Sequence, residues 1–199
     1  MKIKLSLLLL WLPIIANAQN LVRCNESASF FVNLKADFYC YIKLTGKVSE
    51  TGNSRVIAIN NCALQTLLVN KQDYTSKGNE DIPVLTNYMI SETQYFTSVY
   101  KEKLNLMMVP VDVSKDKKAV IWYFDIPEKF QKQVQPGETP AVAQVSISEV
   151  IGDFVFSIGT TQFKGQSLDD LKKLLTDLMV SVKYGTGQFD QHRICDTNK

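Results

Sequence analysis

The sequence predicts an α+β fold in which an antiparallel sheet packs against helices as an α/β/α sandwich. Residues 119–126 read AVIWYFDI and are apolar on both faces of a strand until Asp125, as in a central strand that is covered on both sides. Residues 142–150 and 154–161 are two strand-like runs around Gly152, which supplies the positive φ of a tight turn. They predict a hairpin.

An amphipathic helix near the C-terminus is the third observation that favours this fold. Ser167 followed by Asp170 is typical of a helix N-terminus. Apolar side chains then recur along one stripe: Leu168, Leu171, Leu174, Leu175, Leu178, Met179 and Val182. Because such a stripe has to be buried, we expect this helix to pack on the sheet and to end at Gly185 and Gly187.

The first half of the chain predicts further strands. Phe38–Leu44 (FYCYIKL) is aromatic and β-branched, and residues 55–60 and 63–69 flank a turn at residues 60–62. We expect these three strands to form an antiparallel meander. For residues 20–33, a short helix and an extended arm both stay open.

A second helix is predicted between the two groups of strands. Residues 71–83 are rich in charge, Ser, Gly and Asn and predict a surface loop. Ser91 followed by Gln94 forms a capping box, so we expect a helix to begin at Ser91 and to lead into an extended segment at residues 107–113.

The first 18 residues have the order of a cleavable secretory signal peptide. Lys2 and Lys4 precede an apolar stretch at residues 5–15, and residues 16–18 read Ala-Asn-Ala. We expect cleavage before Gln19, so that the mature chain is one domain over residues 19–199 that acts in the periplasm or outside the cell.

Two alternative interpretations of the N-terminus are weaker. An uncleaved anchor needs roughly 20 apolar residues to cross a bilayer, and this run has about 11. Residues 21–24 (LVRC) resemble a lipoprotein signal ending at Cys24, but Arg23 stands where a small residue is expected. No later run is long enough to predict a transmembrane segment.

Charge argues against nucleic acid as a partner. The signal peptide removes two of the 22 basic residues, so the mature chain carries 20 basic and 20 acidic residues. Because phosphate binding depends on clustered Lys and Arg, a neutral chain without a basic stripe does not predict it.

All four cysteines follow the predicted cleavage position, and an oxidising compartment favours their pairing: Cys24, Cys40, Cys62 and Cys195. The sequence alone allows three connectivities and also free buried thiols. We favour Cys40 with Cys62, which lie on strands predicted to be neighbours, and Cys24 with Cys195, which would tie down a polar tail. No C-x-x-C spacing predicts a zinc site.

No motif predicts catalysis, and no catalytic residue can be assigned. The one histidine, His192, lies in the polar tail, and a G-x-S-x-G elbow is absent. Two carboxylate pairs could be proposed for glycoside chemistry, Asp125 with Glu128 and Glu149 with Asp153, but each lies at a strand end or turn where acids are ordinarily solvated.

Metal and cofactor sites are not predicted either. Asp112 and Asp116 lack the third ligand and the glycine of a calcium loop, and Asp169 and Asp170 are explained as favourable charges at a helix start. Phosphate-binding glycine loops are missing. Six aromatic residues could line a groove but are better explained as core: Tyr39, Tyr41, Tyr95, Tyr100, Trp122 and Tyr123.

The C-terminal half resembles the end of a PsbP-like or DcrB-like domain. The matching segments are AVIWYFDIPEKF, VAQVSISEVIGDFVFSIGTTQF and SLDDLKKLLTDLMVSVKY, within residues 119–184. The resemblance covers about a third of the chain and rests on the order of elements. It implies an antiparallel sheet between helical layers and a non-enzymatic binding or assembly role, with no catalytic residues to carry over.

These observations favour an exported binding or assembly module without catalysis or cofactor, whose partner is an unknown exported protein or a small ligand. A small secreted hydrolase with a non-motif active site and an inhibitor or immunity-type protein are the alternatives. Converging polar groups in a pocket would favour the enzyme, whereas an exposed apolar patch would favour the binding module.

Overall fold

The computed structural model describes residues 19–24, 27–35, 37–51, 53, 56–75, 78, 80–115, 117–135 and 137–187. Within these residues the protein is mostly β, with two antiparallel sheets of four and seven strands and three α-helices. The predicted α+β sandwich is therefore wrong. The physical reason is that segments near both ends of the described chain form a second sheet, whereas the sequence predicted that only helices pack on the first sheet.

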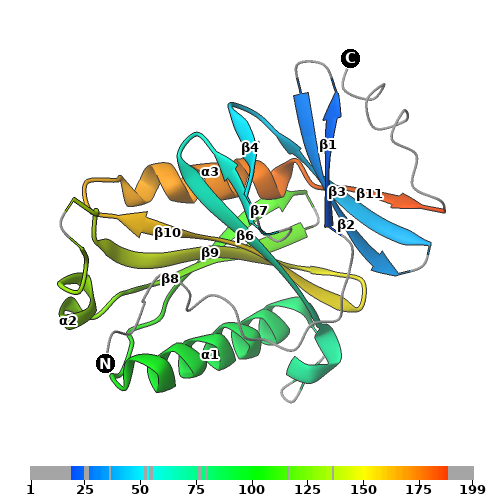
Figure 1. Ribbon diagram of the computed structural model, residues 1–199. Helices are drawn as coiled ribbons and strands as arrows, with labels where there is room; N and C mark the ends of the chain where they lie inside the picture. Colours follow the sequence, from blue (N-terminus) through cyan, green and yellow to red (C-terminus); the bar gives the residue numbers. More distant parts are fainter. Residues whose placement is uncertain are drawn as a thin grey trace.

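The larger sheet has the strand order β4-β5-β6-β10-β9-β8-β7 (Figure 1). Its strands are β4 (Val48–Glu50), β5 (Val56–Ile59), β6 (Cys62–Asn70), β7 (Met107–Ser114), β8 (Lys117–Asp125), β9 (Ala141–Ile151) and β10 (Phe154–Phe163). Every neighbouring pair is antiparallel. The central position of β8, β9 and β10 agrees with their apolar sequences.

The smaller sheet has the order β1-β2-β3-β11. Its strands are β1 (Gln19–Cys24), β2 (Ser27–Lys35), β3 (Phe38–Leu44) and β11 (Lys183–Thr186). The predicted meander of Phe38–Leu44 with the strands that follow it is therefore wrong, because β3 pairs with β2 and β11. The first and last strands of the described chain lie in one sheet.

Two predicted turns are confirmed. Asn60 and Asn61 both have positive φ, 47° and 70°, and join β5 to β6. Gly152, with φ 58°, opens the two-residue turn between β9 and β10. Turns of this kind need left-handed backbone at these positions, which Asn and Gly adopt at low cost.

The helices lie on opposite faces of the larger sheet. Figure 1 shows α1 (Asp81–Tyr100) on one side and α3 (Leu168–Val180) on the other, with the short α2 (Glu128–Gln131) after β8 and a 3₁₀ turn, η2 (Lys71–Tyr74), before α1. The predicted helix start at Ser91 is wrong, because α1 begins ten residues earlier. Pro83, which suggested a loop, lies in the first turn of α1, where its missing N–H costs no helical hydrogen bond.

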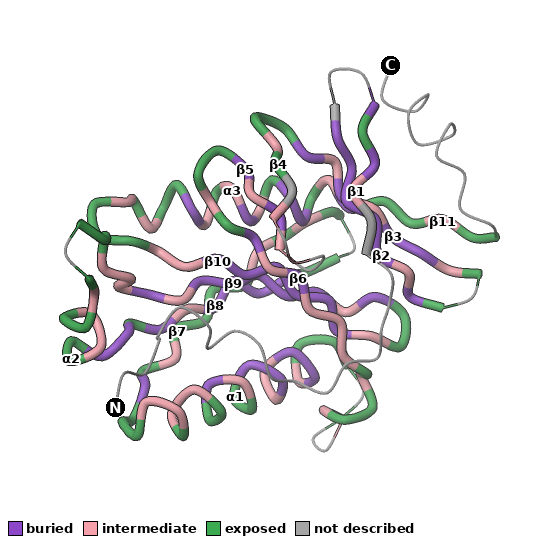
Figure 2. The backbone as a smooth tube through the Cα atoms, in the orientation of Figure 1, coloured by how far each residue is buried: buried purple, intermediate pink, exposed green. Residues whose placement is uncertain are grey.

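Strand β8 shows why both faces of the larger sheet are apolar. Ala119 and Ile121 belong to a core shared with α3 and the smaller sheet. Val120, Trp122 and Phe124 belong to a second core under α1. The prediction that residues 119–126 form a strand covered on both sides is confirmed, and Figure 2 shows the buried backbone concentrated in this part of the sheet.

Candidate functional site

The tightest polar cluster in the described residues joins the two sheets. Lys117 on β8 donates from Nζ to Glu149 Oε1 on β9 at 3.0 Å, and Tyr184 on β11 donates from its hydroxyl to the same oxygen at 2.7 Å. Lys117 Nζ also lies 2.7 Å from the Tyr184 hydroxyl and 3.9 Å from the centre of its ring. Glu149 is therefore held by one group from each sheet.

Burial makes this cluster energetically important. The Glu149 side chain is 3% exposed, whereas that of Lys117 is 43% exposed. Burial, followed by the charge of Glu149 and the hydrogen bond to it, raises the pKa of Tyr184 well above its ordinary value. Cys40 lies nearby on β3, and burial together with the Glu149 charge raises the pKa of its thiol to about 12.

The cluster is better suited to fastening the sheets than to chemistry. Lys117 and Tyr184 both donate to the Glu149 carboxylate, so neither is directed at an open position where a substrate could bind. A tyrosine with a raised pKa stays protonated near neutral pH and so cannot accept a proton as a base, and a fully buried thiol that stays protonated is a poor nucleophile. We therefore interpret Lys117, Glu149 and Tyr184 as a structural tie between the sheets.

A second polar chain lies under α1. Trp122 Nε1 donates to Ser148 Oγ at 2.9 Å, and Ser148 Oγ donates to Ser157 Oγ at the same distance. Ser157 Oγ in turn lies 3.3 Å from the carbonyl oxygen of Ile147. Ser157 is also hydrogen-bonded to Tyr88, whose pKa is raised by burial and by the nearby Glu92 charge, so the chain satisfies buried polar groups and holds the Tyr88 hydroxyl protonated.

The predicted core assignment of six aromatic residues is confirmed for Trp122, and Tyr100 and Tyr123 pack against the cores, whereas Tyr39, Tyr41 and Tyr95 belong to neither core of the described residues. Tyr39 and Trp122 are buried, Tyr41, Tyr100 and Tyr123 are half-buried, and Tyr95 is exposed. Tyr88 on α1 is absent from the predicted set, yet it is fully buried and packs edge-on against both Tyr74 and Trp122. Tyr88 precedes the predicted helix start at Ser91, so the sequence did not place it on the buried face of a helix; α1 in fact begins at Asp81.

The two predicted carboxylate pairs do not act as pairs. Glu149 is engaged by Lys117, whereas Asp153 in the β9–β10 turn forms an ion pair with Lys35 on β2. Asp125 ends β8 and is exposed, and Glu128, exposed in the first turn of α2, forms an ion pair with Lys132. Glu149, Asp153 and Glu128 are thus each bonded to a lysine rather than to the other carboxylate of the pair.

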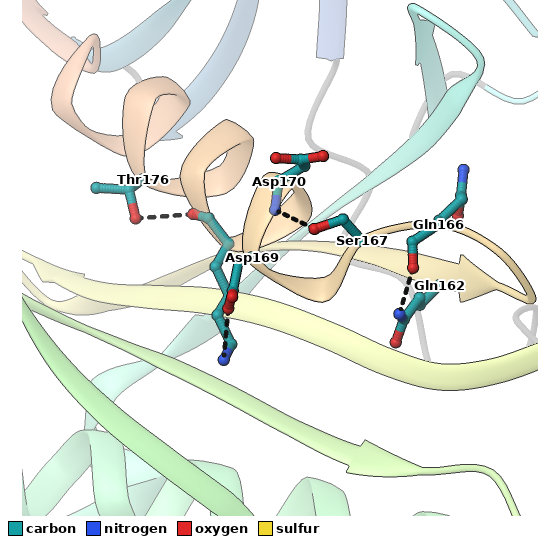
Figure 3. Close-up of polar contacts among 7 residues, drawn as sticks. Gln162, Gln166, Ser167, Asp169, Asp170 and Thr176 are labelled. Carbon is teal, nitrogen blue, oxygen red and sulfur yellow. Dashed lines mark hydrogen bonds and ion pairs between the residues drawn. The ribbon is translucent and has the colours of Figure 1, made fainter.

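The acidic residues at the start of α3 have the role that the sequence predicts. Ser167 is the N-cap, and its Oγ accepts a hydrogen bond from the backbone N–H of Asp170 at 3.2 Å (Figure 3). Asp169 and Asp170 lie in the first turn, where negative charge is favourable. Asp112 is exposed on β7, and Asp116 lies outside the described residues.

The predicted pairing of Cys40 with Cys62 is wrong. Both are free thiols, because Cys40 lies on β3 in the smaller sheet and Cys62 begins β6 in the larger one. The Cys24–Cys195 pairing stays a prediction, since Cys195, like His192, lies outside the described residues.

Strand β7 carries an exposed apolar segment that the sequence predicts only as extended. Met107, Met108 and Val109 are 52%, 43% and 41% exposed. The strand forms one edge of the larger sheet and pairs only with β8. The signal is present in the sequence as MMVPV, but an apolar strand is ordinarily buried, so local pattern alone predicts no exposure.

Pro110 limits the backbone hydrogen bonds that the open edge of β7 can form. Proline has no N–H, so it fits an antiparallel ladder without loss where its nitrogen faces away from the neighbouring strand, here β8. On this geometry the open edge lacks a donor between Met108 and Asp112. An incoming strand would therefore lose a hydrogen bond at the centre of β7.

Replacing Pro110 with Thr is expected to increase self-association, because it restores that donor on an apolar edge. Sedimentation velocity over a range of protein concentrations should show a larger weight-average mass for the variant than for the original chain. The control is Val111→Thr on the same strand. Identical profiles for Pro110→Thr and the original chain would contradict the assigned role of Pro110.

No helix in the described part of the chain has both the length and the hydropathy that a membrane span requires. In the same part, no three His, Cys, Asp or Glu side chains are grouped closely enough to bind a metal ion. Comparison of the chain with protein-family models, curated proteins and solved structures gave no match.

Proposed function

We propose that this protein is an exported binding module that contacts another protein through β7. The observation that carries the proposal is that three exposed apolar side chains follow one another on an open sheet edge, Met107 and Val109 on one face of the strand and Met108 on the other. Exposed apolar side chains that cluster in this way are typical of interaction surfaces, and methionine adapts well to a partner's shape.

Charges around β7 indicate what kind of partner would fit. Lys101 and Lys103 precede the strand, Lys115 follows it, and Lys118 lies on β8 opposite Asp112 of β7; in the described region these four lysines have no ion pair. Two copies of β7 paired in either direction would bring lysines opposite lysines. The surface therefore fits a different protein, with an apolar surface bordered by carboxylates.

Export is part of the proposal and rests on the sequence of residues 1–18, which lie outside the described residues. Strand β1 begins at Gln19, the residue that follows the predicted cleavage position. The periplasmic or secreted location and the resemblance of residues 119–184 to PsbP-like and DcrB-like domains likewise stay predictions. That resemblance would agree with a non-enzymatic role.

The proposal prefers binding to hydrolysis because of how the polar groups are used. In the Lys117–Glu149–Tyr184 cluster each group is bonded to another member, and the hydroxyls of the serine chain under α1 are bonded within the buried network. Three of the nine exposed large apolar side chains of the described residues instead follow one another on the β7 edge. That arrangement matches a binding surface better than an active site.

A photo-crosslinking residue at position 108 is expected to give a discrete adduct with another exported protein in the producing cells. The matched control is the same residue at position 180, because Val180 on α3 has a similar exposure of 51%. Lys103→Glu and Lys118→Glu together should reduce the adduct at position 108 at least fivefold by reversing the local charge. No adduct, or equal adducts at both positions, would contradict the proposal.

A further inference from the structure

The four methionines of the described residues lie in two contrasting environments. Met89 on α1 and Met179 on α3 are 0% and 1% exposed, whereas Met107 and Met108 on β7 are 52% and 43% exposed. Because side chains alternate along a strand, Met107 lies on the α3 face of β7 and Met108 on the α1 face. Solvent therefore reaches a methionine on each face of the strand.

An aromatic residue of β8 lies opposite each exposed methionine. Met107 pairs with Tyr123, and Met108 pairs with Trp122. Side chains paired in this way have Cβ atoms about 5 Å apart. Trp122 is 3% exposed and is the only tryptophan after residue 18. Its fluorescence therefore reports on a change of polarity at position 108.

The thioethers of β7 are better placed to react with oxidants than the free thiols, Cys40 and Cys62. Cys40 is fully buried, and Cys62 is half-buried. Burial raises the pKa of Cys40 to about 12 and also raises the pKa of Cys62. Because oxidants react with the thiolate, a raised pKa slows the oxidation of both thiols. A thioether has no proton to lose, so exposure decides its rate.

We propose that Met107 and Met108 form an oxidation site at which an oxygen-donating oxidant, such as hydrogen peroxide, switches the β7 edge from apolar to polar. The methionine sulfur attacks one oxygen of the peroxide, an S–O bond forms and the O–O bond breaks. The proton on the attacked oxygen passes to the departing hydroxide, which leaves as water. The sulfur loses two electrons to the peroxide, and the product is methionine sulfoxide, which reductases convert back to methionine.

Sulfoxide formation changes the property on which binding through β7 depends. A sulfoxide is polar, so its burial against an apolar partner surface costs free energy. Of the three exposed apolar side chains that follow one another on β7, only Val109 then stays unchanged. Oxidation should therefore release the partner. This consequence rests on the proposed function, whereas the selective oxidation of Met107 and Met108 does not.

Peptide mapping after a timed exposure of the folded protein to hydrogen peroxide tests the site. Met107 and Met108 should form sulfoxide at least tenfold faster than Met89 and Met179. In urea the four methionines should react at similar rates, because the folded environment that distinguishes them is lost. Equal rates at the four positions in the folded protein would overturn the proposal.

The change of polarity is measured without a partner. Peroxide treatment should make the protein elute earlier from a hydrophobic-interaction column and should change the emission of Trp122. The emission should still change in Met107→Leu, which retains Met108, and should change much less in Met108→Leu. Unchanged elution after oxidation would overturn the proposal, and equal emission changes in the two variants would overturn the placement of Met108 beside Trp122.

Crosslinking from position 109 separates this inference from the proposed function, because both methionines are then retained. Peroxide applied before irradiation should reduce the adduct at least fivefold. In Met107→Leu with Met108→Leu, whatever adduct forms should not change with peroxide, because leucine has no sulfur to oxidise. No adduct before peroxide treatment would contradict the proposed function, whereas an adduct that persists on oxidised β7 would overturn the switch alone.

Discussion

Replacing Lys117 with Met is expected to lower the free energy of unfolding by about 3 kcal/mol, because it leaves the buried Glu149 carboxylate with only the Tyr184 hydroxyl as a partner. A charge removed from water is stable only while its counter-charge is present. Urea unfolding followed by tryptophan fluorescence measures the effect directly, since Trp122 is buried in the core under α1.

Lys173→Met is the matched control for this prediction. Lys173 and Asp177 are 2.6 Å apart, closer than Lys117 and Glu149, but both side chains are exposed. Loss of such a pair should cost less than about 0.5 kcal/mol. The double variant Lys117→Met with Glu149→Leu should recover most of the loss, because no unpaired charge is then buried. Equal losses in Lys117→Met and Lys173→Met would contradict the tie between the sheets.

Raising the pH from 9 to 11 is expected to lower the free energy of unfolding by at least about 4 kcal/mol from Cys40 and Tyr88, and Tyr74 and Tyr184, whose pKa values burial also raises, add to this loss. Burial raises the pKa of Cys40 from 9.0 to about 12 and that of Tyr88 well above 10.0. Above these ordinary values the unfolded chain releases protons that the folded chain retains, so stability falls as pH rises. Each such group contributes about 1.4 kcal/mol per pH unit, Cys40 from pH 9 and Tyr88 from pH 10.

Urea unfolding at half-unit pH steps tests this expectation, with absorbance at 295 nm to follow tyrosine ionisation. Cys40→Ala should flatten the curve between pH 9 and 10, and Tyr88→Phe should flatten it only above pH 10. Stability that is constant up to pH 11 would show that these buried groups ionise as easily in the folded protein as in the unfolded chain.

The parts of the fold that the sequence predicts correctly are those determined by neighbouring residues. The turn at Asn60 and Asn61, the turn at Gly152 and the cap at Ser167 each depend on a few adjacent side chains, and all three are confirmed. The strand at residues 119–126 is predictable because a short apolar run without polar alternation is typical of a strand that is covered on both faces.

The failures have a different physical origin. β3 pairs with β2, within a segment whose state the sequence left open, and with β11, whose pairing of Thr186 with Phe38 no local pattern reveals. Strand β11 escapes prediction because Gly185 suggests a helix end, whereas this glycine makes room for the Tyr39 ring. The predicted fold class is therefore wrong although many of the strands are predicted.

The candidate sites show the same difference between features that adjacent residues determine and features that depend on distant parts of the chain. The sequence offers Glu149 as half of a carboxylate pair, but its partners, Lys117 and Tyr184, lie 32 and 35 residues away in the chain and come from two sheets. No spacing rule connects them. The exposure of Met107 and Met108 likewise depends on β7 being an edge strand, which is a property of the whole sheet.

The pairing of β3 with β11 also determines when the smaller sheet can be completed during synthesis. A ribosome releases the chain from its N-terminus, so Phe38–Leu44 emerges long before Lys183–Thr186. Until then β3 has one open edge, and the joint that Tyr184 closes cannot form. Strands β1 to β3 can pair early, but completion of the smaller sheet must wait for almost the entire chain, which favours final folding after synthesis.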